Sequence, residues 1–173
     1  IGFGIAVWRL VYLEKVARLV KVQQQNPNNP SADNPLGRVM QCYQNLPRPI
    51  DIEVLDAKMS EAVLKEIPAL ERGQPVIKLF ASVAPLLGLL GTVTGMIATF
   101  QAITTFGTGD PKLMAGGISQ ALVTTVQGLV VAIPLLLLHN WVAARSKAVT
   151  HLLDEQSAGL IATELEQQQK QGQ

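Results

Sequence analysis

Residues 79–106 read LFASVAPLLGLLGTVTGMIATFQAITTF, and residues 113–144 read LMAGGISQALVTTVQGLVVAIPLLLLHNWVAA. Neither stretch contains Asp, Glu, Lys or Arg, and each exceeds the roughly 20 apolar residues that a membrane-spanning helix needs. The connector, residues 107–112, is short and rich in Gly and Pro, so the second helix must return antiparallel beside the first. We therefore predict an all-α membrane protein anchored by a helical hairpin.

The composition of the whole chain agrees with this fold class. The 173 residues are 48% apolar and 16% charged, and the mean hydropathy is +0.26, outside the range of ordinary soluble domains. The formal charge of +1 shows no basic excess, which excludes a nucleic-acid-binding surface as an interpretation. Cys42 is the only cysteine and lies in a polar stretch, so we expect an unpaired, half-buried thiol.

The first residues of the chain resemble the end of another membrane span. The apolar run of residues 1–8 is too short to cross a bilayer, and Trp8 and Tyr12 are placed to lie at the headgroup level. Basic residues mark the cytoplasmic exit of this span: Arg9, Lys15, Arg18 and Lys21. Residues 1–14 are therefore predicted to end a first, truncated transmembrane helix, which gives three such helices in all.

Residues 15–78 are predicted to form a cytoplasmic helical insert. Asn26 to Pro35 is rich in Asn and Pro and indicates a loop. Asp51 can cap the N-terminus of a helix that ends or kinks near Pro68. The apolar residues of that helix recur at helical spacing: Ile52, Leu55, Met59, Val63 and Ile67.

The region after the second long stretch, residues 145–173, is predicted to continue as a cytoplasmic helix with a polar tail that frays from residue 167. Basic residues flank the open side of the hairpin: Arg72, Lys78, Arg145 and Lys147. Because loops rich in Lys and Arg stay in the cytoplasm, the connector, residues 107–112, is expected to be periplasmic and the C-terminus cytoplasmic. This topology is that of a multi-pass membrane protein, which lies in the bacterial inner membrane if the cell is Gram-negative.

Both long stretches contain many small and hydroxylated residues. Gly91 and Gly95 form a GxxxG pattern, which favours close helix packing, although the pattern alone is weak evidence of function. Pro85 and Pro134 each remove a backbone hydrogen bond and are expected to bend their helices. The remaining small residues that we assign to helix packing are Gly88 in the first stretch and Ser119, Thr124, Thr125, Gly128 and Ala132 in the second.

The threonines Thr92, Thr99, Thr124 and Thr125 have two interpretations. Each hydroxyl can bond to the backbone carbonyl one turn earlier and have no further role, or it can line a polar path. Proton relays through membranes generally use buried Asp, Glu or His, and neither stretch contains an acid, so the hairpin cannot relay protons alone.

Other chemistry has little support in the sequence. His139 lies near the basic end of its span, where an interfacial anchor is the ordinary interpretation, and His151 is too distant to complete a metal pair. There is no phosphate-binding loop of the P-loop type and no plausible pair of nucleophile and base. We therefore expect no enzyme activity, no metal and no cofactor.

Two blocks of sequence resemble the ExbB/TolQ/MotA family of proton-channel subunits. The first is Ala84-Pro-Leu-Leu-Gly-Leu-Leu-Gly-Thr-Val-Thr-Gly-Met96, similar to the family pattern AP-x-x-GL-x-GTV-x-G. The second, residues 117–134, reads GISQALVTTVQGLVVAIP and is similar to GI-x-x-AL-x-x-T-x-x-GL-x-x-AIP. The details around Gln120, residues 34–38 and residues 70–73 look more like the ExbB-like branch with an extra periplasmic N-terminal domain.

The resemblance implies a three-span subunit, N-terminus outside, that assembles as a homopentameric ring around helices of an ExbD- or TolR-like partner. That partner carries a membrane Asp, and a TonB-like protein receives the energy. The resemblance also implies that Thr92 and Thr125 present hydroxyls to the central helices. Gln120 departs from the family, because many members carry Glu there, so the role of an ionised group cannot be transferred.

Three other functions remain open. The first is a TolQ-like role in envelope maintenance, and the second is a MotA-like motor role, although MotA-like subunits have four spans. The third is a non-conducting membrane scaffold in which the small residues serve packing alone.

Overall fold

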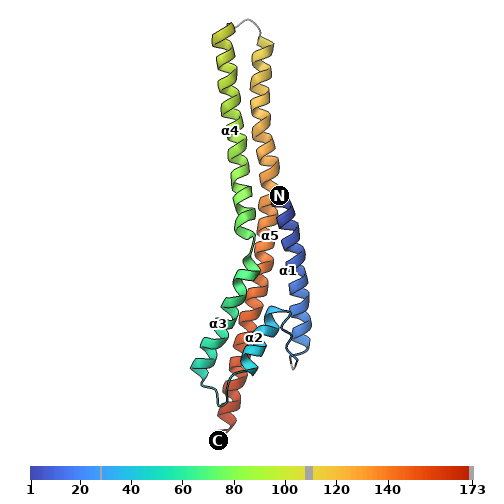
Figure 1. Cartoon of the computed structure of the whole chain (residues 1–173), viewed down its shortest axis with the longest axis vertical. Helices are drawn as coiled ribbons and strands as arrows, with labels where there is room; N and C mark the ends of the chain where they lie inside the picture. The colour runs from blue at the N-terminus through green and yellow to red at the C-terminus, as the bar shows by residue number, and fades with distance from the viewer. Residues whose placement is uncertain (28, 108–110, 172–173) are drawn as a thin grey trace. The chain divides into compact units, whose positions relative to one another are not determined.

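The computed structural model describes residues 1–27, 29–107 and 111–171 (Figure 1). In these residues the chain forms only helices: α1 (Gly2–Gln25), α2 (Pro35–Gln44), α3 (Ile52–Glu71), α4 (Gln74–Phe106) and α5 (Pro111–Gln171). The all-α prediction is confirmed for the part of the chain that is described. The helices group into two compact units, which we call the hairpin unit (Ile1–Val7 and Gly73–Asn140) and the four-helix unit (Trp8–Arg72 and Trp141–Gln173).

The hairpin unit consists mainly of α4 and the first half of α5, which run side by side in Figure 1. α4 ends at Phe106, and the next residue, Gly107, has a positive φ of 74° that is favourable only for glycine. The Gly107 amide donates to the Ile103 carbonyl at 2.9 Å. Of the predicted connector, residues 108–110 lie outside the described residues. The start of α1 also packs in this unit, where Ala6 is buried.

Two helical stretches in the described residues are long and apolar enough to cross a membrane, Ile52–Thr105 and Met114–Lys170. They include the two spans predicted from the sequence except for residues 106 and 113. α4 begins at Gln74, before the predicted start of its span at residue 79, so the helix is longer than the span. A first membrane span ending at residue 14 stays a prediction.

The two prolines predicted to bend the spans both lie within continuous helices. Pro85 is in the interior of α4, and Pro134 is in the interior of α5. Proline removes one backbone hydrogen bond from a helix, but in a membrane helix neighbouring groups can satisfy the carbonyl that loses its partner. The bends themselves stay predictions.

In the four-helix unit, side chains cap two helices, and one of these caps was predicted from the sequence. Asp51 caps α3 by accepting a hydrogen bond from the Glu53 amide at 2.9 Å, which confirms that prediction. Asn34 caps α2 in the same way, with the Gly37 amide at 2.7 Å. Pro35 is the first residue of α2 rather than the end of the predicted loop, because proline suits the first turn of a helix.

α3 and α5 are longer than their sequence patterns suggested. α3 contains Pro68 and ends three residues later, at Glu71. α5 remains helical to Gln171, so most of the tail that was expected to fray is helix. Apolar side chains of these helices, α1 and α2 form the core of the four-helix unit, and its fully buried members include Leu13, Val20, Leu36, Val39, Leu55, Met59, Leu70 and Leu153.

Arg9 ties α1 to the end of α3. Its side chain is 2% exposed, and its Nη2 donates to the carbonyls of Ala69 and Leu70 at 2.9 and 2.7 Å. These carbonyls belong to the last turn of α3, where the helix itself supplies no partner. Arg9, which the sequence placed among the residues marking an exit from the membrane, is therefore a helix cap supplied from another helix.

The last turn of α2 and the connector that follows it are fixed to the end of α5. The Tyr43 hydroxyl donates to the Glu164 carboxylate at 2.6 Å, and Arg48 lies 3.9 Å from the same carboxylate. Gln168, one turn later, donates to the Ile50 carbonyl at 2.6 Å. Burial raises the pKa of the Tyr43 phenol, and the hydrogen bond to Glu164 raises it further.

Candidate functional site

The candidate site lies along the contact between α4 and α5 in the hairpin unit, which we call the glycine–threonine seam. At Gly88 a β-carbon would lie 3.0 Å from the Thr124 carbonyl oxygen, and at Gly128 it would lie 2.7 Å from the Ala84 carbonyl oxygen. At Gly91 it would lie 2.5 Å from the Thr124 hydroxyl. The two backbones thus approach so closely that only glycine fits at these positions.

Gly95 extends the seam toward the connector, because a β-carbon there would lie 2.7 Å from the Ala121 β-carbon. Gly117 and Ala121 on α5 belong to the same contact, although the sequence analysis did not single them out. Ala121 is 2% exposed, and a β-carbon at Gly117 would lie 2.5 Å from the Thr99 hydroxyl. Ser119, which was assigned to this packing surface, is instead exposed.

The hydroxyls of Thr92 and Thr125 are in direct hydrogen-bonding contact across the seam. Thr92 Oγ1 also lies 3.2 Å from the Gly88 carbonyl oxygen and 3.4 Å from that of Ala121. Thr125 Oγ1 lies 3.3 Å from the Gly88 carbonyl oxygen. Because each hydroxyl has one proton, one member of the pair must accept when the other donates.

Thr124 joins the same cluster. Its hydroxyl donates to the Ala121 carbonyl at 2.6 Å and lies 3.3 Å from the Gly88 carbonyl oxygen. The Gly88 carbonyl is therefore within hydrogen-bond reach of three hydroxyls, those of Thr92, Thr124 and Thr125. A carbonyl oxygen has only two lone pairs, so the three hydroxyls cannot all donate to it well at once, and the protons have alternative arrangements.

Thr99 does not reach this cluster. It is 9% exposed, and its hydroxyl donates at 2.9 Å to the Gly95 carbonyl, one turn earlier in its own helix. This is the ordinary way in which a membrane helix satisfies a threonine. Of the four threonines selected from the sequence, the structure brings three together and leaves Thr99 with a packing contact against Gly117.

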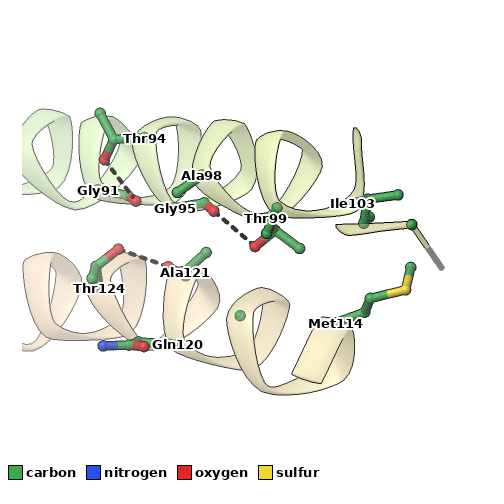
Figure 2. A pocket seen from close by; sticks show the side chains of 13 residues that line it. Gly91, Thr94, Gly95, Ala98, Thr99, Ile103, Met114, Gln120, Ala121 and Thr124 are labelled. Atoms are coloured by element: carbon green, nitrogen blue, oxygen red, sulfur yellow. Dashed lines mark hydrogen bonds between the residues drawn. The ribbon is translucent and has the colours of Figure 1, made fainter. Parts of the chain in front are cut away.

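Beyond the cluster, toward the connector, α4 and α5 leave a hollow of about 930 Å³ (Figure 2). Its lining consists mostly of small residues, and Thr124 is at its inner end. Figure 2 shows Ala121 directed toward α4, whereas Gln120 projects from another side of α5. Gln120 lines the hollow and is exposed in this chain, so the position where many family members carry Glu opens to the outside of the hairpin.

Metal ligands and reactive groups are sparse in the described residues. No group of three or more His, Cys, Asp or Glu side chains there could hold a metal ion. Cys42 is a free, half-buried thiol of α2, in the four-helix unit and not at the seam. The chemistry available along the seam is therefore that of hydroxyls, backbone carbonyls and an amide.

Comparison with known proteins decides the family. A family model described as the MotA/TolQ/ExbB proton channel family matches residues 31–155, which include α4 and the seam portion of α5. The chain belongs to the MotA/TolQ/ExbB proton channel family. The resemblance found in the two sequence blocks is thereby confirmed.

Relatives in this family are named for two systems. A biopolymer transport protein ExbB homolog of Methanothermobacter thermautotrophicus is 32% identical over 159 residues, covering 83% of this chain and 56% of that protein. The Tol-Pal system protein TolQ of Haemophilus influenzae is 36% identical over 91 residues, covering 53% and 40%. The biopolymer transport protein ExbB of Xanthomonas campestris is 31% identical over 102 residues, covering 59% and 40%. The chain thus spans about half the length of these relatives.

Proposed function

We propose that this chain is the ring-forming subunit of an inner-membrane proton channel that couples proton motive force to TonB-dependent transport across the outer membrane. Membership of the proton channel family supports the conducting role. The ExbB names among the relatives support the link to biopolymer transport. The chain carries the two apolar helices that such a role requires.

The observation that carries the proposal is the cluster of three hydroxyls around the Gly88 carbonyl. These hydroxyls lie in a hairpin whose two long stretches contain no ionisable acid or base other than His139. Because the hydroxyl protons have alternative arrangements, Thr92 and Thr125 can accept a proton on one side and pass one on at the other. The cluster thus supplies hydroxyls that can pass a proton along between two long stretches that contain no acid.

A carboxylate must come from elsewhere, because a hydroxyl does not bind an additional proton at neutral pH. We assign this group to the membrane Asp of an ExbD- or TolR-like partner, whose helix lies at the centre of a ring of five copies of this chain. A TonB-like protein takes up the resulting movement. The Gln120 amide lines the hollow beside the cluster and contributes no charge.

The topology of the chain in the bilayer follows from its basic residues. The connector, residues 107–112, lies on the periplasmic side, and the C-terminus lies in the cytoplasm. The first residues end a span whose N-terminal side is periplasmic. In this orientation the hydroxyl cluster lies within the bilayer, between the connector and the basic residues Lys78 and Arg145.

The test replaces the seam hydroxyls without changing side-chain shape. Thr92→Val and Thr125→Val remove a hydroxyl but keep a β-branched side chain, so the helices should still pack. We expect each variant to reduce energy-dependent uptake of siderophores, haem or cobalamin at least tenfold, with normal amounts of assembled complex. Transport assays and native gels of the same membranes measure the two quantities.

Thr105→Val is the matched control for this experiment. Thr105 lies on the same helix, is exposed, and donates only to the Gln101 carbonyl of its own helix among the described residues. Its loss should leave uptake unchanged. Normal uptake in both the Thr92 and the Thr125 variants would contradict the assignment of these hydroxyls to the proton path.

A Tol-Pal role is the second candidate, favoured by the TolQ relatives. In this role the ring and the hydroxyls are the same, but a different partner protein takes up the energy of the proton motive force. A strain lacking this gene distinguishes the two: loss of TonB-dependent uptake supports the first role, and defective envelope constriction with normal uptake supports the second.

A further inference from the structure

The outer side of α1 in the four-helix unit carries an exposed stripe, which we call the α1 stripe: Val11, Lys15, Arg18 and Val22. The spacing of four, three and four residues is that of a helix seam that contacts another helix. Val11 and Val22 are 63% and 57% exposed, although the opposite side of the same helix is buried. Within the described residues Lys15 forms no ion pair, and the ion pair of Arg18 is a long one, 4.0 Å from Glu14.

α3 carries a matching stripe on its own outer side, the α3 stripe: Val54, Ala57, Glu61 and Leu64. Its spacing of three, four and three residues is again that of a helix seam. Val54 and Leu64 are 51% and 63% exposed, whereas Leu55 and Met59 on the opposite side are fully buried. The α1 stripe thus has a valine at each end and two cations between them, and the α3 stripe has three small or apolar residues and Glu61. Both stripes are exposed among the described residues.

The contact between Arg9 and the Leu70 carbonyl sets the relative height of the two helices. α1 and α3 run in opposite directions in Figure 1, and both rise about 1.5 Å per residue. Counting forward from Arg9 along α1 and backward from Leu70 along α3, residues the same number of positions from the contact therefore lie level, to within about one turn. The level pairs are Lys15 with Leu64, Arg18 with Glu61, and Val22 with Ala57.

The two stripes cannot meet within one chain. In the four-helix unit α1 and α3 lie on opposite sides of α5 (Figure 1), and both stripes are exposed. In a ring whose axis is parallel to α1 and α3, however, rotation from one copy to the next preserves height along these helices. Residues that are level within a chain are then level between neighbours, and the α1 side of one copy faces the α3 side of the next.

The charges of the two stripes are complementary. The α1 stripe carries two cations, and Lys21 beside it also forms no ion pair among the described residues. The α3 stripe carries Glu61, and near it Asp56 lies exposed without a cation in the described part of the chain. Lys58 and Lys65 contact Glu61 at 3.0 and 2.8 Å, so an approaching Arg18 would share the Glu61 carboxylate with them.

We propose that the α1 stripe of one copy packs against the α3 stripe of the next copy, with Arg18 facing Glu61. This inference rests on the proposed function, which supplies the ring, and it identifies surfaces of the four-helix unit by which the ring closes. The contact is heterologous: different surfaces of the two copies meet, which suits a closed ring rather than a twofold dimer.

Cysteine cross-linking in the full chain, expressed with its partner, tests the register. In a Cys42→Ser background, the pair Val22→Cys and Ala57→Cys should form disulfides between copies on mild oxidation, giving a ladder of linked oligomers up to the complete ring. Either cysteine alone should give no ladder. The matched control is Val22→Cys with Leu64→Cys, which lies about 10 Å out of register along α3 and should also give none.

Charge reversal tests the central pair. Arg18→Glu and Glu61→Arg should each lower the yield of intact ring, and the double variant should restore it toward the original level. Native mass spectrometry of the unmodified complex separates the two possible failures. A ring that forms without the predicted ladder overturns the stripe pairing and leaves the proposed function standing, whereas a chain that never forms a ring overturns both.

Discussion

The hairpin unit and the four-helix unit hold their helices together by different kinds of contact. In the hairpin unit, helix contact depends on side chains that are missing, at Gly88, Gly91 and Gly128. In the four-helix unit large apolar side chains form the core, and long polar side chains such as Arg9 and Glu164 link helix ends. Lipid supplies no hydrophobic drive between helices, so close backbone approach must hold the hairpin. These two charged groups of the four-helix unit are buried, and hydrogen bonds with carbonyls and with the Tyr43 hydroxyl compensate for their burial.

The first prediction compares two glycines of α5 in the hairpin unit. Gly128→Leu should break the seam, because a β-carbon at this position already meets backbone atoms of α4 that cannot move aside. The cost should exceed the about 1–3 kcal/mol typical of an overpacked core. Thermal unfolding in detergent, followed by circular dichroism, measures it.

Gly116→Leu is the matched control, since no other atom lies within 4 Å of a β-carbon there among the described residues. This variant should unfold at the temperature of the unmodified chain or slightly above it, because leucine favours helix over glycine. Equal destabilisation by both substitutions would show that the glycines do not set the helix contact.

The second prediction concerns the polar cap in the four-helix unit. Arg9→Met keeps an unbranched side chain but leaves the carbonyls of Ala69 and Leu70 without a partner. Each lost partner should cost about 1–3 kcal/mol, and the last turn of α3 should exchange its amide hydrogens faster. Hydrogen exchange measured on peptides covering residues 66–72 reports this locally.

Arg9→Lys keeps donors for the same carbonyls and should recover part of the protection. Arg72→Met provides the second comparison, because Arg72 is exposed and caps neither carbonyl. Exchange that is equally fast in the Arg9 and Arg72 variants would contradict the capping role.

The smallest expected effect comes from Tyr43→Phe, which removes the hydrogen bond to Glu164. We expect a loss of about 1.5 kcal/mol at pH 7, the lower end for a bond to a charged group, since Tyr43 is only half-buried. The pKa of the Tyr43 phenol is raised in the folded chain, so its contribution is complete below the unfolded value of about 10. The contribution is lost as the pH rises through the folded pKa.

Unfolding of the unmodified chain and the Phe variant should therefore differ by a constant amount from pH 7 to 9 and converge above about pH 10. A difference that grows with alkalinity would have the wrong sign for this hydrogen bond.

The sequence was sufficient for the features that depend on local pattern. The absence of charge predicted the two long helices, and the Asp51 cap followed from residue type and position. The choice among small residues was less accurate, since Ser119 was assigned to the seam in place of Gly117. Residues 117 and 121 share one face of a helix, whereas residue 119 lies about 200° away from 117, so angular position would have corrected the assignment.

Contacts between residues far apart in the chain could not be predicted in this way. Arg9 reaches a carbonyl 61 residues away, and Tyr43 reaches Glu164 across 121 residues. Locally, Arg9 has the signature of any basic residue near a membrane interface, and Glu164 that of any acid on a surface helix. Only the packing of the four-helix unit distinguishes a buried cap from an exposed charge.

Proton uptake by proteoliposomes that contain this chain and its acid-bearing partner tests the central claim most directly. With an imposed membrane potential, the original complex should acidify the vesicle interior. The Thr125→Val complex should lose at least nine-tenths of that flux, while the Thr105→Val complex keeps it. Undiminished flux in the Thr125 variant, with the complex intact, would contradict the account in which the seam hydroxyls carry the proton.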